Sequence, residues 1–192
     1  MSESVKSVLL VGVGGQGIIR ASDILSALMM KAGFDVKKSE VHGMAQRGGC
    51  VSSHVRFGPK VYSPIAKEGD VDILVSFEKL ETLRYLKYLK KGGKVIVNDE
   101  EVYPPSVNLG DADYPSDAID LIKKYFKDVK VVDATALALR SGDKRMANTV
   151  VLGVLSSYLD IPVSVWEAVL EENFPPKILK GNIHAFNLGR EV

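Results

Sequence analysis

The stretch Ser7-Val-Leu-Leu-Val-Gly12-Val-Gly14-Gly15-Gln16-Gly17 decides the fold of this sequence. Its first part is short, continuous and rich in β-branched residues, which is typical of a strand buried on both faces of a parallel sheet. Its second part fits the pattern G-x-G-x-x-G, and apolar residues then recur at helical spacing as far as Lys31. The stretch therefore predicts a strand, a glycine turn and a helix that ends near Gly33.

Strands and helices alternate along the rest of the chain. We expect further strands over residues 34–41, 50–57, 72–77, 94–98 and 129–132. We expect helices over 78–91, 116–126, 146–159 and 164–173, one that begins at Ala134, and a final short one that Gly189 ends. This alternation predicts an α/β fold with three αβα layers and a mostly parallel, Rossmann-like sheet, whose loops at the carboxyl ends of the strands form the binding edge.

Several local signals carry expectations of their own. Leu80, Leu83, Leu86 and Leu89 share one side of the helix that precedes Gly92 and Gly93. Asp133 is placed to cap the helix that follows it, and Ser164 with Glu167 matches a capping box. Residues 99–115 contain three of the eight prolines and predict an exposed excursion with little regular structure.

Polar and apolar residues alternate along the expected strand over 50–57, which predicts that only one of its faces is covered. Cys50, Ser52, His54 and Arg56 form the polar side of the alternation. We therefore expect His54 on a surface that faces solvent or another subunit.

The composition restricts the classes of partner. Lys and Arg number 25 against 24 Asp and Glu, so no overall field attracts nucleic acid or an anionic membrane. Apolar runs are far shorter than a bilayer requires, and the start of the chain does not resemble a signal peptide, which favours the cytoplasm. The single cysteine, Cys50, excludes an internal disulfide and a cluster held by four cysteines of this chain. The length suits one domain over 1–192.

The glycine loop alone is compatible with more than one function. Its backbone lets a phosphate approach the amino terminus of a helix. Glu40 also follows the loop at about the sequence separation at which nicotinamide enzymes carry the acidic residue that binds the ribose. These glycines equally allow close packing of the helix on the sheet or contact with a partner. A stand-alone NAD(P)-dependent reductase and a nucleotide-binding regulatory module are therefore alternatives at this point.

A second glycine segment is the most unusual part of the sequence. Glu40-Val-His42-Gly-Met-Ala-Gln-Arg47-Gly48-Gly49-Cys50 brings a carboxylate, an imidazole and a guanidinium into one loop. Such a loop presents donors suited to a phosphate or carboxylate. Because it follows the second strand, we expect it to lie beside the first glycine loop.

The two segments together carry a resemblance. G-V-G-G-Q-G, followed by E-V-H-G-M-A-Q-R-G-G and C-V-S-S-H-V-R-F-G, resembles the γ-type subunit or domain of 2-oxoacid:ferredoxin oxidoreductases, equivalent to domain III of pyruvate:ferredoxin oxidoreductase. The M-A-Q-R-G-G version is most similar to the β subunit of indolepyruvate:ferredoxin oxidoreductase. The resemblance extends over the whole chain, including Asn148 and the closing N-I-H-A-F-N-L-G of Asn182 to Gly189.

The resemblance implies a non-autonomous subunit of an enzyme of anaerobic metabolism that converts a 2-oxoacid to an acyl-coenzyme A. It implies a large partner subunit with thiamine diphosphate and [4Fe-4S] clusters, which passes electrons to ferredoxin, so that the isolated chain is inactive and holds none of these cofactors by itself. Coenzyme A also belongs to the complex. Segments 99–115 and 174–192 are candidates for docking the large subunit.

The expected role of this chain is to form one wall of a composite active site by positioning and electrostatics. We expect no metal site and no catalytic acid, base or nucleophile in it. Arg47 would bind an anionic group, and Glu40 would orient Arg47 or His42. The candidate cofactor-contacting residues are Gly12, Gly14, Gly15, Gln16, Gly17, Glu40, His42, Arg47, Gly48 and Gly49.

Overall fold

The computed structural model describes residues 4–43 and 49–192. Within these ranges, strands β1 to β6 form one sheet in the order β2-β3-β1-β4-β5-β6. The strands are β1 Lys6–Val13, β2 Asp35–His42, β3 Cys50–Gly58, β4 Val71–Ser76, β5 Leu89–Asn98 and β6 Val129–Val132. β1, β4, β5 and β6 are mutually parallel, while β3 runs antiparallel to its neighbours β1 and β2. The sheet is therefore mixed but mostly parallel, as expected.

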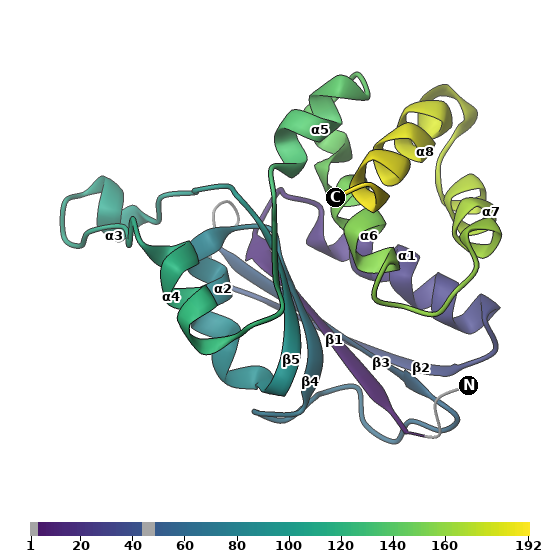
Figure 1. The fold of residues 1–192 in the computed structure, drawn as a ribbon, viewed down its shortest axis with the longest axis horizontal. Helices are drawn as coiled ribbons and strands as arrows, with labels where there is room; N and C mark the ends of the chain where they lie inside the picture. Colours follow the sequence, from purple (N-terminus) through teal and green to yellow (C-terminus); the bar gives the residue numbers. More distant parts are fainter. Residues whose placement is uncertain (1–3, 44–48) are drawn as a thin grey trace.

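Helices cover both faces of the sheet (Figure 1). α1 and the group α5 to α8 lie on one face, and α2 and α4 lie on the other. The helices are α1 Ile18–Lys31, α2 Lys79–Tyr85, α3 Pro105–Asn108, α4 Ala118–Tyr125, α5 Ala134–Arg140, α6 Ala147–Ser156, α7 Val163–Asn173 and α8 Pro176–Arg190, with 3-10 turns at Leu86–Tyr88 and Lys144–Met146. The three-layer αβα prediction is confirmed.

The core consists of two clusters, one on each face of the sheet, and successive side chains of β1 point into them alternately. Val8 and Leu10 point into the cluster under α1 and α6, whereas Leu9 and Val11 point into the cluster under α2 and α4. All four are at most 1% exposed. A strand buried on both faces favours apolar residues at successive positions, which explains the continuous apolar run from Val8 to Val11.

The helix expected over 78–91 is shorter than the sequence predicts. α2 ends at Tyr85, and Leu89 already belongs to β5, where it pairs with Val71. Gly92, with φ of +76°, lies inside β5, at the irregular part of the β4–β5 pairing, rather than stopping a helix. Leu89 is thus buried because it pairs in the sheet. The leucine spacing alone does not distinguish a longer helix from a helix that is followed by a strand.

The capping box at Ser164 is also wrong. Pro162 occupies the cap position and the helix begins at Val163, which places Ser164 inside its first turn, with no side-chain cap. Proline fixes φ near the helical value and so starts the helix earlier. The cap predicted at Asp133 is confirmed, because its side chain accepts a hydrogen bond of 2.8 Å from the Ala136 amide.

The final helix is long, and Gly189 does not end it. α8 has 15 residues, and Gly189 lies within its last turn against α6. A Cβ on Gly189 would overlap the Val150 carbonyl oxygen, and one on Gly153 would overlap that of Phe186. These two glycines therefore allow α6 and α8 to cross at close range. Segment 174–192 packs on its own core through this crossing, and its role in docking stays a prediction.

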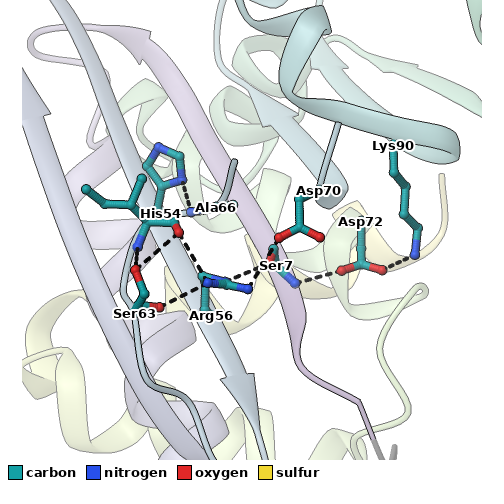
Figure 2. Close-up of polar contacts among 9 residues, drawn as sticks. Ser7, His54, Arg56, Ser63, Ala66, Asp70, Asp72 and Lys90 are labelled. Carbon is teal, nitrogen blue, oxygen red and sulfur yellow. Dashed lines mark hydrogen bonds and ion pairs between the residues drawn. The ribbon is translucent and has the colours of Figure 1, made fainter. Parts of the chain in front are cut away.

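The polar face of β3 is covered, contrary to expectation. His54 is only 5% exposed, and its Nδ1 accepts a hydrogen bond of 3.3 Å from the Ala66 amide (Figure 2). Arg56 donates to Ser7 Oγ at 3.0 Å and, at 3.2 Å each, to the carbonyl oxygens of Ser63 and Ile65. Segment 59–70 folds back over the strand and is held there by these bonds. The alternation of β3 thus reflects a polar contact inside the chain.

Candidate functional site

The strand connections diverge at the carboxyl ends of β1 and β4. From β1 the chain crosses through α1 to β2 on one side, and from β4 it crosses through α2 to β5 on the other. Such a switch of direction leaves a crevice where α/β proteins bind ligands. The glycine loop lies at this point, directly after β1.

Three glycines of the loop are required for different structural reasons. Gly12 is buried, and a Cβ there would lie 2.9 Å from Phe77 Cβ. Gly15 and Gly17 have φ of +103° and +81°, a conformation that side chains disfavour. Gly17 also caps α1 without a side-chain hydrogen bond, which leaves the first amides of the helix available to an anion.

Gln16 holds the loop in shape. Its Oε1 accepts a hydrogen bond of 2.8 Å from the Val13 amide, and its Nε2 donates at 3.0 Å to the Phe77 carbonyl oxygen. The side chain therefore joins the ends of β1 and β4 across the switch point. Both of its polar atoms are engaged within the protein, which gives Gln16 a structural function in addition to any contact with a ligand.

A polar cavity of about 310 Å³ opens beside the loop. It is lined by Gly15, Gln16, Gly17, Phe77, Asn98, Glu100, Thr135, Lys144, Arg145 and Ala147. These residues come from the ends of β1, β4 and β5, from the start of α5 and from the turn before α6. The volume lies within the range of roughly 300–1,000 Å³ that small-molecule sites occupy.

One wall of the cavity is a fixed hydrogen-bond network. Asn98 is 2% exposed, accepts from the Ala134 amide at 2.9 Å and donates to Glu100 Oε2 at 2.9 Å. Thr135 Oγ1 donates to the same carboxylate oxygen at 3.4 Å. Glu100 is thus held in the lining by two neighbours.

The lining of the cavity also contains two cations. Lys144 and Arg145 are both exposed, and Arg145 bonds Asp143 with Nε at 2.8 Å. This contact, with the Arg145 amide, holds the pKa of Asp143 at about 2. With the uncapped start of α1, the cations create a site suited to a phosphate or carboxylate group.

The second glycine segment meets the first where the structure describes it. The Gly14 amide donates a hydrogen bond of 2.9 Å to the Gly49 carbonyl oxygen, and the Gly43 amide donates one of 2.7 Å to Cys50. The expectation that the two segments lie side by side is therefore confirmed for Gly14 and Gly49. Arg47 and Gly48 lie outside the described residues.

Glu40 and His42 are brought together but do not line the cavity. His42 Nε2 lies 4.0 Å from Glu40 Oε2, and Glu40 also contacts Lys38. Both belong to β2, which β3 separates from β1. The orienting role expected of Glu40 stays a prediction, whereas a ribose held beside Gly12 to Gly17 would be out of its reach.

Cys50 has the properties of an unreactive thiol. Its Sγ lies 3.1 Å from Tyr85 Oη, and burial raises the pKa of the thiol to about 11. In the part of the chain that is described, no three His, Cys, Asp or Glu side chains are grouped as metal ligands. Over the same residues, no helix is long and apolar enough to cross a membrane.

Sequence reasoning did not identify most of the cavity wall. Asn98, Glu100, Thr135, Lys144 and Arg145 are distant from the glycine loop in sequence and carry no motif. The available signal was positional, since Asn98 ends a predicted strand and Thr135 follows a predicted helix cap. Ends of parallel strands meet at one edge, so polar residues there are the first candidates for a site.

Comparison with known proteins gives a consistent result. Residues 7–192 match the family model described as pyruvate ferredoxin/flavodoxin oxidoreductase. Indolepyruvate oxidoreductase subunit IorB of Thermococcus kodakarensis is 40% identical over 95% of this chain and 93% of its own. Pyruvate oxidoreductase subunit PORC of Thermotoga maritima is 22% identical, with a TM-score of 0.75 over 97% of this chain and 96% of its own.

A larger solved protein contains the same fold. The 2-oxoglutarate:ferredoxin oxidoreductase of Magnetococcus marinus, solved with 2-oxoglutarate, coenzyme A and succinyl-CoA, is 20% identical, with a TM-score of 0.75. The match covers 99% of this chain but 31% of that one. The fold thus occurs both as a separate chain and as part of a longer polypeptide.

Proposed function

The chain belongs to the pyruvate ferredoxin/flavodoxin oxidoreductase family, and from this premise we propose that it is the γ-type subunit of a 2-oxoacid:ferredoxin oxidoreductase that acts on indolepyruvate or a related arylpyruvate. The enzyme would oxidatively decarboxylate the oxoacid to an acyl-coenzyme A. The substrate is inferred from the 40% identity to an indolepyruvate oxidoreductase subunit.

The observation that carries the proposal is the polar cavity beside the first glycine loop. Its lining includes Gly15 and Gly17 at the start of α1, with Lys144 and Arg145. The second glycine segment joins the same loop outside this lining, where the Gly14 amide donates a hydrogen bond of 2.9 Å to the Gly49 carbonyl oxygen. The lining groups bind and orient an anion, and they perform no bond-breaking step themselves. This chain therefore contributes positioning and electrostatic stabilisation to a site completed by another chain.

The donor set of the cavity suits the phosphate groups of coenzyme A. Backbone amides at Gly15 and Gly17, with the ammonium of Lys144 and the guanidinium of Arg145, would hold such groups. Thiamine diphosphate, which stabilises the carbanion formed on decarboxylation, and the [4Fe-4S] clusters would be supplied by a large partner subunit. That this fold forms 31% of a larger oxidoreductase chain supports a partner of that kind.

The second segment would complete the same wall. Its described residue Gly49 accepts a hydrogen bond from the Gly14 amide, and the part played by Arg47 and Gly48 stays a prediction from the sequence. Arg47 would bind an anionic group of the substrate or coenzyme, and Glu40, which lies 4.0 Å from His42 Nε2, would orient Arg47 or His42. This role rests on the adjacency of the segments in sequence.

The strand order argues against the reductase alternative. In a nicotinamide enzyme, the acidic residue at the end of the second strand must reach the ribose beside the glycine loop. Here β3 stands between β1 and β2, so Glu40 is two strands away from that loop. Tight NADH binding by the purified chain, with unaided reduction of an oxoacid, would favour the reductase instead.

The test is reconstitution of the complex. A tagged chain should recover from its native extract a large partner that contains thiamine diphosphate and iron–sulfur clusters. In that complex, Arg47→Ala and the double change Lys144→Gln with Arg145→Gln should each raise the KM for coenzyme A or oxoacid about tenfold or more. Lys124→Gln on α4, outside the cavity lining, is the matched control. Unchanged kinetics in both variants would contradict the proposed wall.

A further inference from the structure

The connection from β5 to α4 forms an acidic arm, which we define as residues 99–117. Its helix α3 stands away from the sheet, beyond α2 and α4 (Figure 1). All charged residues of the arm are acidic, namely Asp99, Glu100, Glu101, Asp111, Asp113 and Asp117. Lys79 Nζ compensates Asp99 and Glu101 at 2.9 Å and 2.7 Å. Asp111 and Asp113 are exposed and form no ion pair with any residue in the described ranges.

The tip of this arm exposes a large apolar side chain next to those two carboxylates. Leu109 is 76% exposed, and Asp111 follows it after Gly110. The Leu109 amide donates a hydrogen bond of 2.9 Å to the Pro105 carbonyl oxygen, and the Asp111 amide donates one of 2.8 Å to that of Ser106. The backbone of the tip is therefore fixed, so a partner that buries Leu109 has little backbone left to order.

A groove of the opposite charge lies at the carboxyl end of α4. This basic groove, of about 480 Å³, is lined by Leu86, Lys87, Leu89, Lys91, Gly92, Tyr125 and Phe126. Among the described residues, its lining contains two lysines and no acidic side chain. Lys91, and Lys127 directly after Phe126, are exposed and have no ionic partner in the part of the chain that the structure describes. Apolar surface combined with free lysines suits an apolar side chain that is accompanied by carboxylates.

Helix α4 has the same polarity along its own length. Asp117 and Asp120 stand at its start, Lys123 and Lys124 stand near its end, and all four are exposed. Such a distribution suits the helix dipole by itself, but the dipole does not require the carboxylates of the arm or the lysines of the groove, which lie outside the helix. With eight residues, α4 is about 12 Å long and joins the acidic arm at one end to the basic groove at the other.

A surface that is acidic at one end and basic at the other is complementary to a second copy of itself. When two α4 helices lie antiparallel about a two-fold axis, the acidic arm of each copy meets the basic groove of the other. The two contacts are then identical, as in an isologous interface, and the assembly closes at the dimer. Within one chain no described arm residue lines the groove, so the groove is left for another molecule.

We propose that two copies of this chain associate through these surfaces. Leu109 of each copy is seated in the basic groove of the other, and the carboxylates of Asp111 and Asp113 face its lysines. The occupant is a second copy, because this chain itself supplies the exposed apolar side chain, the free carboxylates and the reciprocal groove. The sequence predicts docking of a large subunit by segment 99–115, whereas here that segment binds its own kind. The proposal does not depend on the function proposed for the carboxyl-edge cavity.

The test measures self-association of the purified full chain by sedimentation velocity, up to submillimolar concentration. We expect monomers and dimers without larger species. Dimerisation should weaken about tenfold or more between about 0.05 M and about 0.5 M salt, because salt screens exposed charges. A chain that stays monomeric in low salt, or that forms open-ended polymers, would overturn the proposal. If the chain is monomeric and loss of the groove lysines instead releases the large partner subunit from the reconstituted complex, the groove belongs to that subunit.

Charge-reversed variants identify the two surfaces. The arm variant, Asp111→Lys with Asp113→Lys, and the groove variant, Lys91→Glu with Lys127→Glu, should each dimerise about tenfold or more weakly than the unaltered chain. An equimolar mixture of the two variants should recover dimers, because the reversed arm then meets the reversed groove and the unaltered arm meets the unaltered groove. Failure of the mixture to recover dimers, or dimers of unaltered strength in both variants, would contradict the proposal.

Two further variants separate the apolar contact from a general effect of charge. Leu109→Asp should lose dimers, because it places a charge where the groove receives an apolar side chain. Lys177→Glu with Lys180→Glu is the control, since both lysines are exposed on α8, which lies on the other face of the sheet from α4. The control should dimerise as the unaltered chain does, and urea denaturation checks that every variant folds. Dimers that survive Leu109→Asp, or that are lost in the control, would exclude the arm and groove as the interface.

Discussion

The carboxyl edge of the sheet and the polar face of β3 differ in how their polar groups are used. Under segment 59–70, Arg56 donates to Ser7, Ser63 and Ile65, and His54 accepts from Ala66. At the carboxyl edge, the first amides of α1 and the ammonium of Lys144 line an open cavity, together with Arg145, which is exposed although it also bonds Asp143. The comparison shows that unusual polar residues mark a candidate site where they stay accessible from an open cavity.

Sequence alone does not separate the arginines of these two regions. Arg56 belongs to the distinctive stretch around the second glycine segment, whereas Arg145 carries no motif. Yet Arg56 has a side chain only 16% exposed, whereas that of Arg145 is 84% exposed. Arg56 is therefore part of the scaffold and Arg145 is available to a partner or ligand, which leads to opposite expectations for mutation.

The largest effect is expected from Arg56→Met. The change leaves the Ser63 and Ile65 carbonyl oxygens without their donor and frees segment 59–70 from the sheet, so the free energy of unfolding should fall by about 3 kcal/mol. Urea denaturation measures the loss. Lys67→Met, an exposed change in the same segment, should stay within about 0.5 kcal/mol of the unaltered chain. Equal stability of the two variants would show that segment 59–70 is not held by Arg56.

A smaller loss of stability is expected from Gly12→Ala. The new methyl group would meet Phe77 Cβ at 2.9 Å, and such overpacking should cost about 2 kcal/mol. Gly15→Ala is the matched variant, because nothing lies within 4 Å of its Cβ position but its φ is +103°. Backbone strain alone should cost about 1 kcal/mol there. A larger loss at Gly15 than at Gly12 would reverse the assignment of the two glycines.

The pH dependence of stability should identify His54. Burial, and then the charge of Arg56, lower the pKa of its imidazole below the ordinary value of 6.5. The unfolded chain takes up a proton below pH 6.5 while the folded chain does not, so stability is lost as the pH falls from 6.5 towards the folded pKa. His54→Gln should flatten urea-derived stability across this window, and the exposed His184→Gln should not. An unaltered slope in His54→Gln would exclude this imidazole as the cause.

The smallest effect on stability is expected at the carboxyl edge. Lys144→Gln with Arg145→Gln should change the free energy of unfolding by less than about 0.5 kcal/mol, because both side chains are exposed. The same double change should weaken binding of coenzyme A by the assembled complex. Sharp destabilisation without any change in binding would place these cations in the scaffold and remove the contrast with Arg56.

The fold was predictable where the signal is local. The apolar run of β1 and the 3.6-residue periodicity of α1 each arise from burial of one element, and both elements occur within two residues of the expected bounds. The predicted bounds of helices and strands are wrong where a contact with a distant residue decides which local structure forms. Leu89 becomes buried by pairing with Val71, and Gly189 stays helical because it meets Val150.

The site was only half predictable for the same reason. The glycine loop and Gly49 carry a motif, so their adjacency followed from their order in the chain. Asn98, Thr135 and Arg145 reach the cavity only because the strand order brings their elements to one edge. The network that covers His54 depends on segment 59–70, whose path no periodicity encodes.

The close crossing of α6 and α8 has a consequence for synthesis of the chain. A Cβ at position 153 would overlap the Phe186 carbonyl oxygen, so α6 packs this closely on α8 only with glycine there. During translation, α6 therefore emerges with an apolar surface that stays open until more than thirty further residues have followed. In this interval the exposed apolar surface favours aggregation and binding by chaperones, and formation of the crossing buries it.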